Sequence, residues 1–193
     1  MISTAGVTDS EICSDTPTYV IANVTGTAST YNSLLWSTSG TGSFSNNTIL
    51  NPVYTPTAAD RTAGSVTLTL TADAKGSCVD ATATINLIIT PAAVVVAGVD
   101  AEICAGSSYT IVGASITGVA DGVWSSAGGG SFIGGSTFTT ATGYTPSAAE
   151  VTAGTATLTL TSNDPDGAGD CTTQQDQVVI TITPVPLIST AGV

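Results

Sequence analysis

Four cysteines are the residues of this chain whose type and spacing point most directly to chemistry, namely the formation of disulfide bonds. Cys13 and Cys78 occupy places that Cys104 and Cys171 occupy again later in the sequence. Four cysteines allow three pairings, and only Cys13–Cys78 with Cys104–Cys171 is compatible with each copy folding as the same independent unit. We therefore predict one disulfide inside each copy. Free buried thiols are the alternative.

The predicted disulfides bear on stability and on location. Each would close a loop of roughly 65 residues and contribute about 3–4 kcal/mol, which matters for a domain at the small end of the stable range. Disulfides persist in oxidising compartments. The cysteines therefore predict an extracellular protein at the cell surface.

Acidic side chains are the second set that could do chemistry. The chain has 14 Asp and Glu residues against Lys75 and Arg61 alone, and its formal net charge is −12. This charge repels nucleic acid and anionic lipid, and it argues against either as a partner. Carboxylates are hard oxygen ligands of the kind that calcium needs. Six of them are candidate calcium ligands: Asp60, Asp100, Glu102, Asp164, Asp166 and Asp170.

Catalysis is disfavoured by elimination. The chain has no histidine, and Lys75 is its one lysine. These absences remove histidine-assisted serine and cysteine nucleophiles, Schiff-base chemistry and zinc sites of the usual Cys/His type. The acids lie at loops and domain ends, with no evident cleft for a carboxylate pair. We predict that the protein is not an enzyme and has no cofactor other than calcium.

The elements that must position these residues come in two copies, with a period of about 90 residues. Glu11-Ile12-Cys13 returns as Glu102-Ile103-Cys104, and Tyr54-Thr55-Pro56 returns as Tyr144-Thr145-Pro146. The six residues 188–193 also spell the same sequence as 2–7. The predicted boundaries are 1–91 for repeat 1, 92–184 for repeat 2 and 185–193 for the start of a third repeat.

Two-residue alternation of apolar and polar side chains predicts half-buried strands. Residues 65–71 should turn Val66, Leu68 and Leu70 inward, and residues 177–183 should do the same with every second side chain: Val178, Ile180 and Ile182. About seven short strands in ~90 residues are typical of an immunoglobulin-like sandwich. The predicted fold is thus all-β, with two tandem immunoglobulin-like β-sandwich domains.

Two further features fit this sandwich. Trp36 and Trp124 should fill the two cores, with Leu34, Leu35 and Val123 buried beside them; stacking on a carbohydrate is the alternative role. Residues 57–64 and their counterparts 147–154 predict a helical turn between two strands. The candidates for exposed aromatic side chains are few: Tyr31, Tyr109 and Phe138.

In such a sandwich, the start of the first strand and the loop between strands six and seven lie at the same pole. We expect Cys104 near that strand start and Cys171 in that loop, which makes their disulfide topologically sensible. The candidate acids collect at the same pole, and Asp60 joins them from the end of the preceding domain. A calcium ion there would stiffen the junction between repeats; a solvated acidic loop that keeps the protein soluble is the alternative.

The connections between repeats predict a semi-rigid rod. Residues 89–94 and 183–187 contain proline and no flexible Gly/Ser tract, and such links bend little. No apolar run reaches the length of a membrane span, and no signal segment follows Met1. We therefore expect no membrane insertion of this chain, and we expect any signal or anchor to lie outside it.

A specific resemblance now emerges from the motifs. Three motifs of repeat 2 resemble the tandem repeats of the giant mobile surface adhesins of gliding Bacteroidetes. They are Ala97-Gly98-Val99-Asp100-Ala101-Glu102-Ile103-Cys104, Val123-Trp124-Ser125 and Gly143-Tyr144-Thr145-Pro146. Repeat 1 carries the same signature, and the resemblance covers essentially the whole chain. It implies type IX secretion, cell-surface presentation and adhesion during gliding. A looser similarity to polycystic-kidney-disease-type domains rests on the Trp and the Val-Thr-Leu-Thr strand.

These observations predict a structural and adhesive module in the semi-rigid stalk of a secreted bacterial adhesin for gliding motility and surface attachment. Its partners would be neighbouring repeats, while other regions of the parent protein bind the extracellular surface or glycan. Two alternatives stay open. One is an immunoglobulin-like module that binds a glycan or a protein directly, and the other is a subunit of a self-assembling filament.

Overall fold

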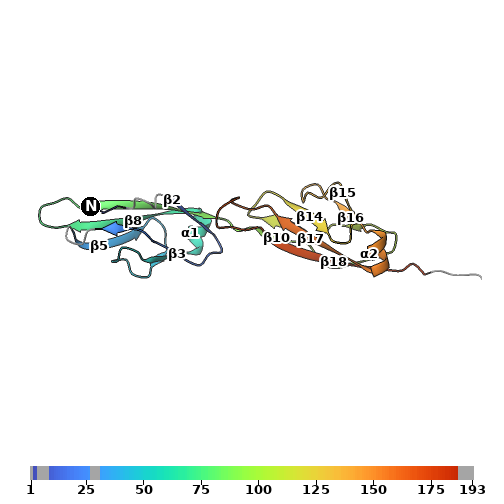
Figure 1. Cartoon of the computed structure of the whole chain (residues 1–193). Helices are drawn as coiled ribbons and strands as arrows, with labels where there is room; N and C mark the ends of the chain where they lie inside the picture. Colours follow the sequence, from blue (N-terminus) through green and yellow to red (C-terminus); the bar gives the residue numbers. More distant parts are fainter. Residues whose placement is uncertain (1, 4–8, 27–30, 187–193) are drawn as a thin grey trace, which may run out of the picture. The chain divides into compact units, whose positions relative to one another are not determined.

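The computed structural model describes residues 2–3, 9–26 and 31–186. The chain forms two units, shown in Figure 1. Unit 1 comprises residues 1–92 together with 166–172, and unit 2 comprises 93–165 together with 173–193. Residues 166–172 belong to repeat 2 by sequence, so the units do not coincide with the repeats. The predicted repetition at 188–193 lies outside the described residues.

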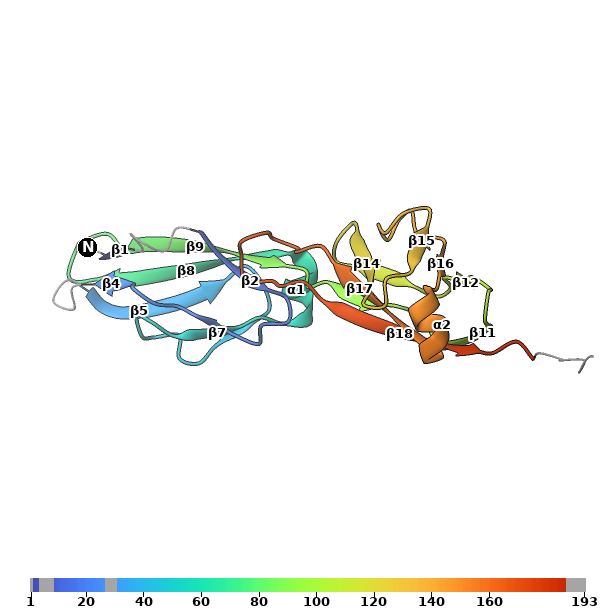
Figure 2. The same cartoon turned by 45° about the vertical axis from the view of Figure 1, so that its right-hand side comes forward.

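Unit 1 is built from three antiparallel or mixed sheets and one short helix (Figure 2). The four-stranded sheet has the order β2 (Asp9–Cys13), β9 (Ala81–Thr90), β8 (Ser65–Ala74) and β5 (Tyr31–Thr38). The three-stranded sheet has the order β3 (Tyr19–Val20), β7 (Val53–Thr55) and β6 (Ser43–Phe44). The remaining elements are β1 (Ile2–Ser3), its partner β4 (Thr25–Gly26) and helix α1 (Ala58–Ala63).

Unit 2 repeats this plan with its own strands. The four-stranded sheet has the order β11 (Ala101–Cys104), β18 (Gln175–Thr183), β17 (Thr155–Ser162) and β14 (Gly122–Ser126). The three-stranded sheet has the order β12 (Tyr109–Thr110), β16 (Gly143–Thr145) and β15 (Ser131–Ile133). The remaining elements are β10 (Val94–Val96), its partner β13 (Ser115–Thr117) and helix α2 (Ala148–Ala153).

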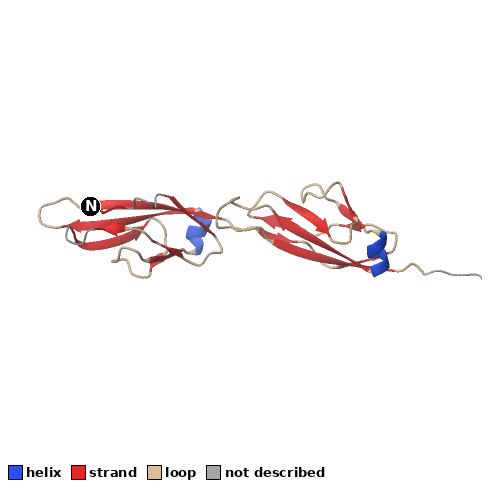
Figure 3. Cartoon of the chain, viewed as in Figure 1, coloured by secondary structure: helices blue, strands red, loops and turns tan. Residues whose placement is uncertain are grey.

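One parallel strand pair stands out in each unit. β2 runs parallel to β9, and β11 runs parallel to β18, whereas the other strand pairs are antiparallel. In unit 2 the chain first pairs through β10 with β13 and then crosses to the four-stranded sheet as β11. The first strand is therefore split between two sheets. This arrangement is an immunoglobulin-like β-sandwich, and the predicted all-β class is confirmed (Figure 3).

The strand faces follow the predicted alternation. Val66, Leu68 and Leu70 are buried, as are their counterparts in the last strand of unit 2: Val178, Ile180 and Ile182. Trp36 and Trp124 are each 2% exposed and lie in the cores, as predicted. Each tryptophan packs beside a phenylalanine and then a tyrosine: Trp36 with Phe44 and Tyr54, Trp124 with Phe132 and Tyr144.

Three predicted exposures are wrong. Leu35 and Val123 are 51% and 48% exposed, because each alternates with its buried tryptophan on a strand whose outer face meets solvent. Tyr109 is 4% exposed and packs in the core of unit 2. Phe138 also packs against that core, and Tyr31 packs against the core of unit 1. Of the three aromatic residues predicted to be exposed, Tyr109 is therefore buried, and Tyr31 and Phe138 are partly buried.

The two predicted helical turns are confirmed as α1 and α2. Thr57 caps α1 by accepting a hydrogen bond from the amide of Asp60, and Asp60 accepts one from the amide of Thr57 in return. Ser147 and Glu150 form the same capping box on α2. Both helices end at a left-handed glycine, Gly64 or Gly154, as short helices often do.

Candidate functional site: the disulfide of Cys13 and Cys171

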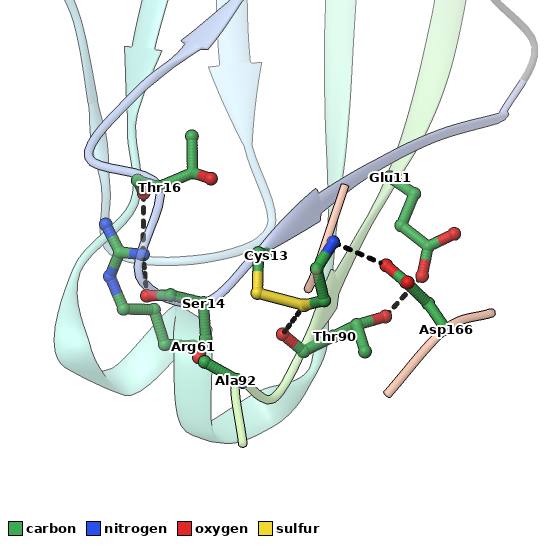
Figure 4. Close-up of a disulfide and its surroundings, with 9 residues drawn as sticks. Glu11, Cys13, Ser14, Thr16, Arg61, Thr90, Ala92 and Asp166 are labelled. Carbon is green, nitrogen blue, oxygen red and sulfur yellow. Dashed lines mark hydrogen bonds between the residues drawn. A yellow bond between two sulfur atoms is a disulfide. The ribbon is translucent and has the colours of Figure 1, made fainter. Parts of the chain in front are cut away.

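The structure contains a disulfide between Cys13 and Cys171, with a Cα–Cα distance of 4.8 Å (Figure 4). Cys13 ends β2, and Cys171 lies in the segment 166–172 that belongs to unit 1. Both side chains are 3% exposed. The predicted pairing of Cys13 with Cys78 and of Cys104 with Cys171 is therefore wrong. A cysteine of repeat 1 bonds a cysteine of repeat 2.

The course of the first strand explains why Cys104 and Cys171 do not pair. Cys104 ends β11 and lies opposite Thr183, the last residue of the parallel strand β18. Cys171 precedes the first residue of β18. A strand of this length spans roughly 30 Å, whereas a disulfide needs Cα atoms about 4.4–6.8 Å apart. Cys104 was predicted near the start of the first strand, but β11 carries it to the opposite end of β18 from Cys171.

Gly98 marks the split in the sequence. It lies between β10 and β11 and has a φ of 106°, a value that glycine adopts without strain. A Cβ atom at this position would also press against the backbone of Val112. The glycine thus permits the backbone conformation at which the first strand of unit 2 changes sheets.

The bonded cysteine of the segment 166–172 has backbone and side-chain partners. The amide of Cys171 donates to Oδ2 of Asp166 at 2.8 Å, and the Cys171 sulfur lies 3.6 Å from the carbonyl oxygen of Thr90. The hydroxyl of Thr90 donates to Glu11 (Figure 4). Asp166, predicted as a calcium ligand, therefore helps to fix the turn that presents Cys171.

Arg61 secures the turn that follows Cys13. Its guanidinium donates to the backbone carbonyls of Ser14 and Thr16, the second at 2.8 Å (Figure 4). The Ser14 side chain in turn accepts from the amide of Ala92 at 2.9 Å. Val151 occupies the place of Arg61 in repeat 2, so these contacts are specific to repeat 1. These contacts were not predicted from the sequence, in which Arg61 counts only as one of two basic residues.

The other two cysteines are free. Cys78 lies in the loop between β8 and β9, Cys104 ends β11, and both are exposed. The alternative of free buried thiols is therefore also wrong for these two residues. A thiol at the surface is available to an oxidant or to another thiol.

The six candidate calcium ligands differ in their surroundings. Asp60 is 2% exposed and belongs to the cap of α1, and Asp100 accepts a hydrogen bond from the amide of Val179 at 2.8 Å. Glu102, Asp164 and Asp170 are exposed. Among the described residues, no group of three or more Cys, Asp or Glu side chains is arranged to hold a metal ion. Calcium binding stays a prediction of the sequence.

A buried tyrosine–carboxylate pair lies beneath each helix. In unit 1 the hydroxyl of Tyr54 donates to Asp60 at 2.9 Å, and the amide of Thr41 donates to the same carboxylate at 2.8 Å. Burial is the largest influence on Asp60 and opposes its ionisation, yet the hydrogen bonds from Thr41, Thr57 and Tyr54 together hold its pKa below the ordinary value of 3.8. Burial, with the nearby Asp60 carboxylate, raises the pKa of Tyr54 above 10.0.

Unit 2 contains the same kind of pair, with Glu150 in the place of Asp60 and with serine in the place of threonine among the hydroxyl groups around it. Tyr144 donates to Glu150 at 2.8 Å, and Ser126 donates to Glu150 at 2.6 Å. Burial again opposes ionisation most strongly, but the hydrogen bonds from Ser126, Ser147 and Tyr144 lower the pKa of Glu150 below 4.5. Gly128 leaves room for the Glu150 side chain, which a Cβ atom there would overlap. These carboxylates are acceptors that hold a loop, a helix cap and a core tyrosine together.

Among the described residues, the helices are too short to cross a membrane. No protein-family model matches the sequence, and no curated protein matches it closely. Solved structures that match the chain include the EC1-2 fragment of human protocadherin-24, at 10% identity with a TM-score of 0.45 over 95% of this chain and 98% of that one. The insect immune protein hemolin is 12% identical, with a TM-score of 0.49 over 96% of this chain and 46% of that one. The EC1-2 fragment of human mucin-like protocadherin is 9% identical, with a TM-score of 0.40 over 96% of this chain and 98% of that one.

Proposed function

We propose that this chain is a structural, non-enzymatic module of the stalk of a secreted cell-surface adhesin. The observation that carries the proposal is the disulfide that holds a segment of repeat 2 in unit 1. The chain passes between the two units three times, at residues 92–93, 165–166 and 172–173. Two domains joined by one linker can still move relative to each other, and additional covalent links restrict that movement. This restriction suits a stalk that holds a distal region away from the cell surface.

The buried groups support the same reading. The two buried tyrosine–carboxylate pairs make their hydrogen bonds to helix caps and loops within the fold. These pairs are Tyr54 with Asp60 and Tyr144 with Glu150. Neither tryptophan is at the surface. The sequence motifs that resemble the adhesins of gliding Bacteroidetes make gliding motility and type IX secretion the specific setting that we propose. The oxidised cysteine pair supports the extracellular location that we propose.

The second candidate is a module that binds a glycan or a protein. It would need exposed aromatic or convergent polar side chains, and the three aromatic residues predicted for that role pack against the cores. A glycan array probed with the oxidised protein separates the two functions. Binding to one glycan class at micromolar affinity would favour the binding module, and a stalk module gives no signal above that of an unrelated acidic domain.

The test of the stalk is the coupling of motion between the units. Nitrogen-15 relaxation of the oxidised protein should fit one rotational diffusion tensor for the amides of both units. The variant Cys13→Ser/Cys171→Ser should give two different tensors, because the segment 166–172 loses its covalent hold on unit 1. The variant Cys78→Ser/Cys104→Ser changes the two exposed cysteines and should behave as the wild type. If the two units tumbled independently of each other in all three proteins, the proposal would be contradicted.

A further inference from the structure

The two exposed thiols are the counterparts of the two bonded cysteines. Cys104 occupies in repeat 2 the place of Cys13, and Cys78 occupies in repeat 1 the place of Cys171. The bonded pair joins a strand-end cysteine of one repeat to a loop cysteine of the next repeat. If neighbouring repeats pair in the same way, Cys104 bonds the loop cysteine of a following repeat, and Cys78 bonds the strand-end cysteine of a preceding repeat.

The backbone around Cys104 is that of the bonded site. Cys13 lies opposite Thr90, and the amide of Ser14 donates to the carbonyl of Thr90 at 2.8 Å. Cys104 lies opposite Thr183, and the amide of Ala105 donates to the carbonyl of Thr183, also at 2.8 Å. The turn after each cysteine is closed by an equivalent hydrogen bond of 3.0 Å, to the carbonyl of Cys13 or of Cys104. The strand-end half of a disulfide site is therefore preformed at Cys104.

The loop half is also equivalent. Cys78 precedes Thr90 by 12 residues, and Cys171 precedes Thr183 by the same 12 residues. The two cysteines therefore lie at the same distance along the chain from the end of the last strand of their repeat, β9 or β18. The Cys78 loop is shorter on its other side, where the amide of Ala74 donates to Asp80 at 2.9 Å. Cys171 is 3% exposed in the bonded state, whereas Cys78 is exposed, as a half-site without its partner should be.

We propose that Cys104 and Cys78 are complementary half-sites for head-to-tail joining of copies of this chain, with Cys104 of one molecule bonded to Cys78 of the next. Formation of the bond removes two protons and two electrons from the two thiols. A low-molecular-weight disulfide such as oxidised glutathione accepts them by thiol–disulfide exchange and leaves as two reduced thiols. The inference concerns the thiol partners and holds whether or not the module is part of a stalk.

Two single variants give a direct test. Cys78→Ser retains Cys104 as its free thiol, and Cys104→Ser retains Cys78. The first is labelled with nitrogen-15, the two are mixed in equal amounts in a glutathione redox buffer, and the disulfide-linked dimers are weighed by mass spectrometry. Random coupling of equally reactive thiols gives twice as many mixed dimers as either like dimer. Complementary half-sites should raise the mixed dimer to at least about tenfold over each like dimer.

Each outcome of this experiment either supports or overturns the inference. A mixed dimer at or below the random proportion, or no dimer at all, overturns the inference. The wild type under the same conditions should form a ladder of disulfide-linked oligomers whose digests contain the Cys104–Cys78 peptide. A monomer with both thiols oxidised to one internal bond also overturns it. The double variant Cys78→Ser/Cys104→Ser keeps Cys13–Cys171 and should stay monomeric, and circular dichroism confirms that all variants fold. Single-tensor tumbling of this double variant would leave the stalk proposal standing even if the mixed dimer failed.

Discussion

Tyr54 donates its hydroxyl hydrogen bond to Asp60 at 2.9 Å, and both side chains are buried. Tyr144 and Glu150 repeat this relationship in unit 2. In unit 1 the pair joins the core aromatic cluster to the cap of α1 and to Thr41 in the loop after β5, and in unit 2 it joins the cluster to the cap of α2 and to Ser126 at the end of β14. A polar pair of this kind fixes three segments at once.

Removal of the Tyr54 hydroxyl should destabilise the protein. Tyr54→Phe keeps the ring but leaves one oxygen of a buried carboxylate short of a donor, and a cost of about 1–3 kcal/mol in the free energy of unfolding is expected. Urea denaturation followed by tryptophan fluorescence measures it. Tyr31→Phe, at a tyrosine outside this pair, should change the unfolding free energy by less. An equal effect of the two substitutions would contradict the role given to the pair.

The two depressed carboxyl pKa values make stability depend on acid pH. Asp60 and Glu150 titrate below their ordinary values of 3.8 and 4.5 in the folded protein. Their contribution is therefore fully present above those ordinary values, and it is lost as the pH falls from them through the folded pKa values. The midpoint of thermal unfolding should fall over this range, and the fall should be smaller for Asp60→Asn/Glu150→Gln. Parallel pH profiles for the two proteins would exclude these carboxylates as its source.

Loss of the disulfide should lower stability more than loss of any single hydrogen bond. Cys13 and Cys171 are 158 residues apart in sequence, and a cross-link over so long a loop contributes on the order of 3–5 kcal/mol. Calorimetry should show a lower unfolding temperature for Cys13→Ser/Cys171→Ser and for the reduced wild type. Reducing agent should leave the unfolding of the double variant unchanged. A reduced wild type as stable as the oxidised one would refute this prediction.

Arg61 should stabilise the turn beside the disulfide. Arg61→Ala removes the donors to Ser14 and Thr16, at a cost of about 1–2 kcal/mol for charge-assisted bonds at a partly exposed site. Hydrogen exchange of the amide of Thr16, which donates to Cys13, should also quicken. The matched control is Val151→Ala in repeat 2, which should leave this exchange rate unchanged. An unaltered rate in Arg61→Ala would show that the guanidinium does not hold the turn.

The calcium prediction needs its own measurement. A bound ion would raise the unfolding temperature by several degrees relative to protein in chelator, because the ion binds only the folded state. Asp164→Asn should abolish that rise. A substitution of Asp166 would also remove the acceptor of the hydrogen bond from the amide of Cys171. Identical curves with calcium and with chelator would reject the metal site.

The sequence by itself determined the repeats, the all-β class and the strand faces that bury Leu68 and Trp36. These features are local: alternation sets the inner face, and Thr57 and Gly64 set the ends of α1. Leu35 follows the same alternation beside buried Trp36, so the prediction that it is buried was wrong, whereas the burial of Tyr109 depends on what covers its strand.

Only the tertiary structure decided the cysteine pairing. A pairing within each repeat and a pairing shifted by one repeat both treat every copy alike, so repetition cannot distinguish them. The difference is which end of the last strand each cysteine reaches, and the crossing of the first strand at Gly98 decides that in unit 2. Disulfides require Cα atoms within a few ångströms of each other, and such proximity across 158 residues is a property of the folded chain alone.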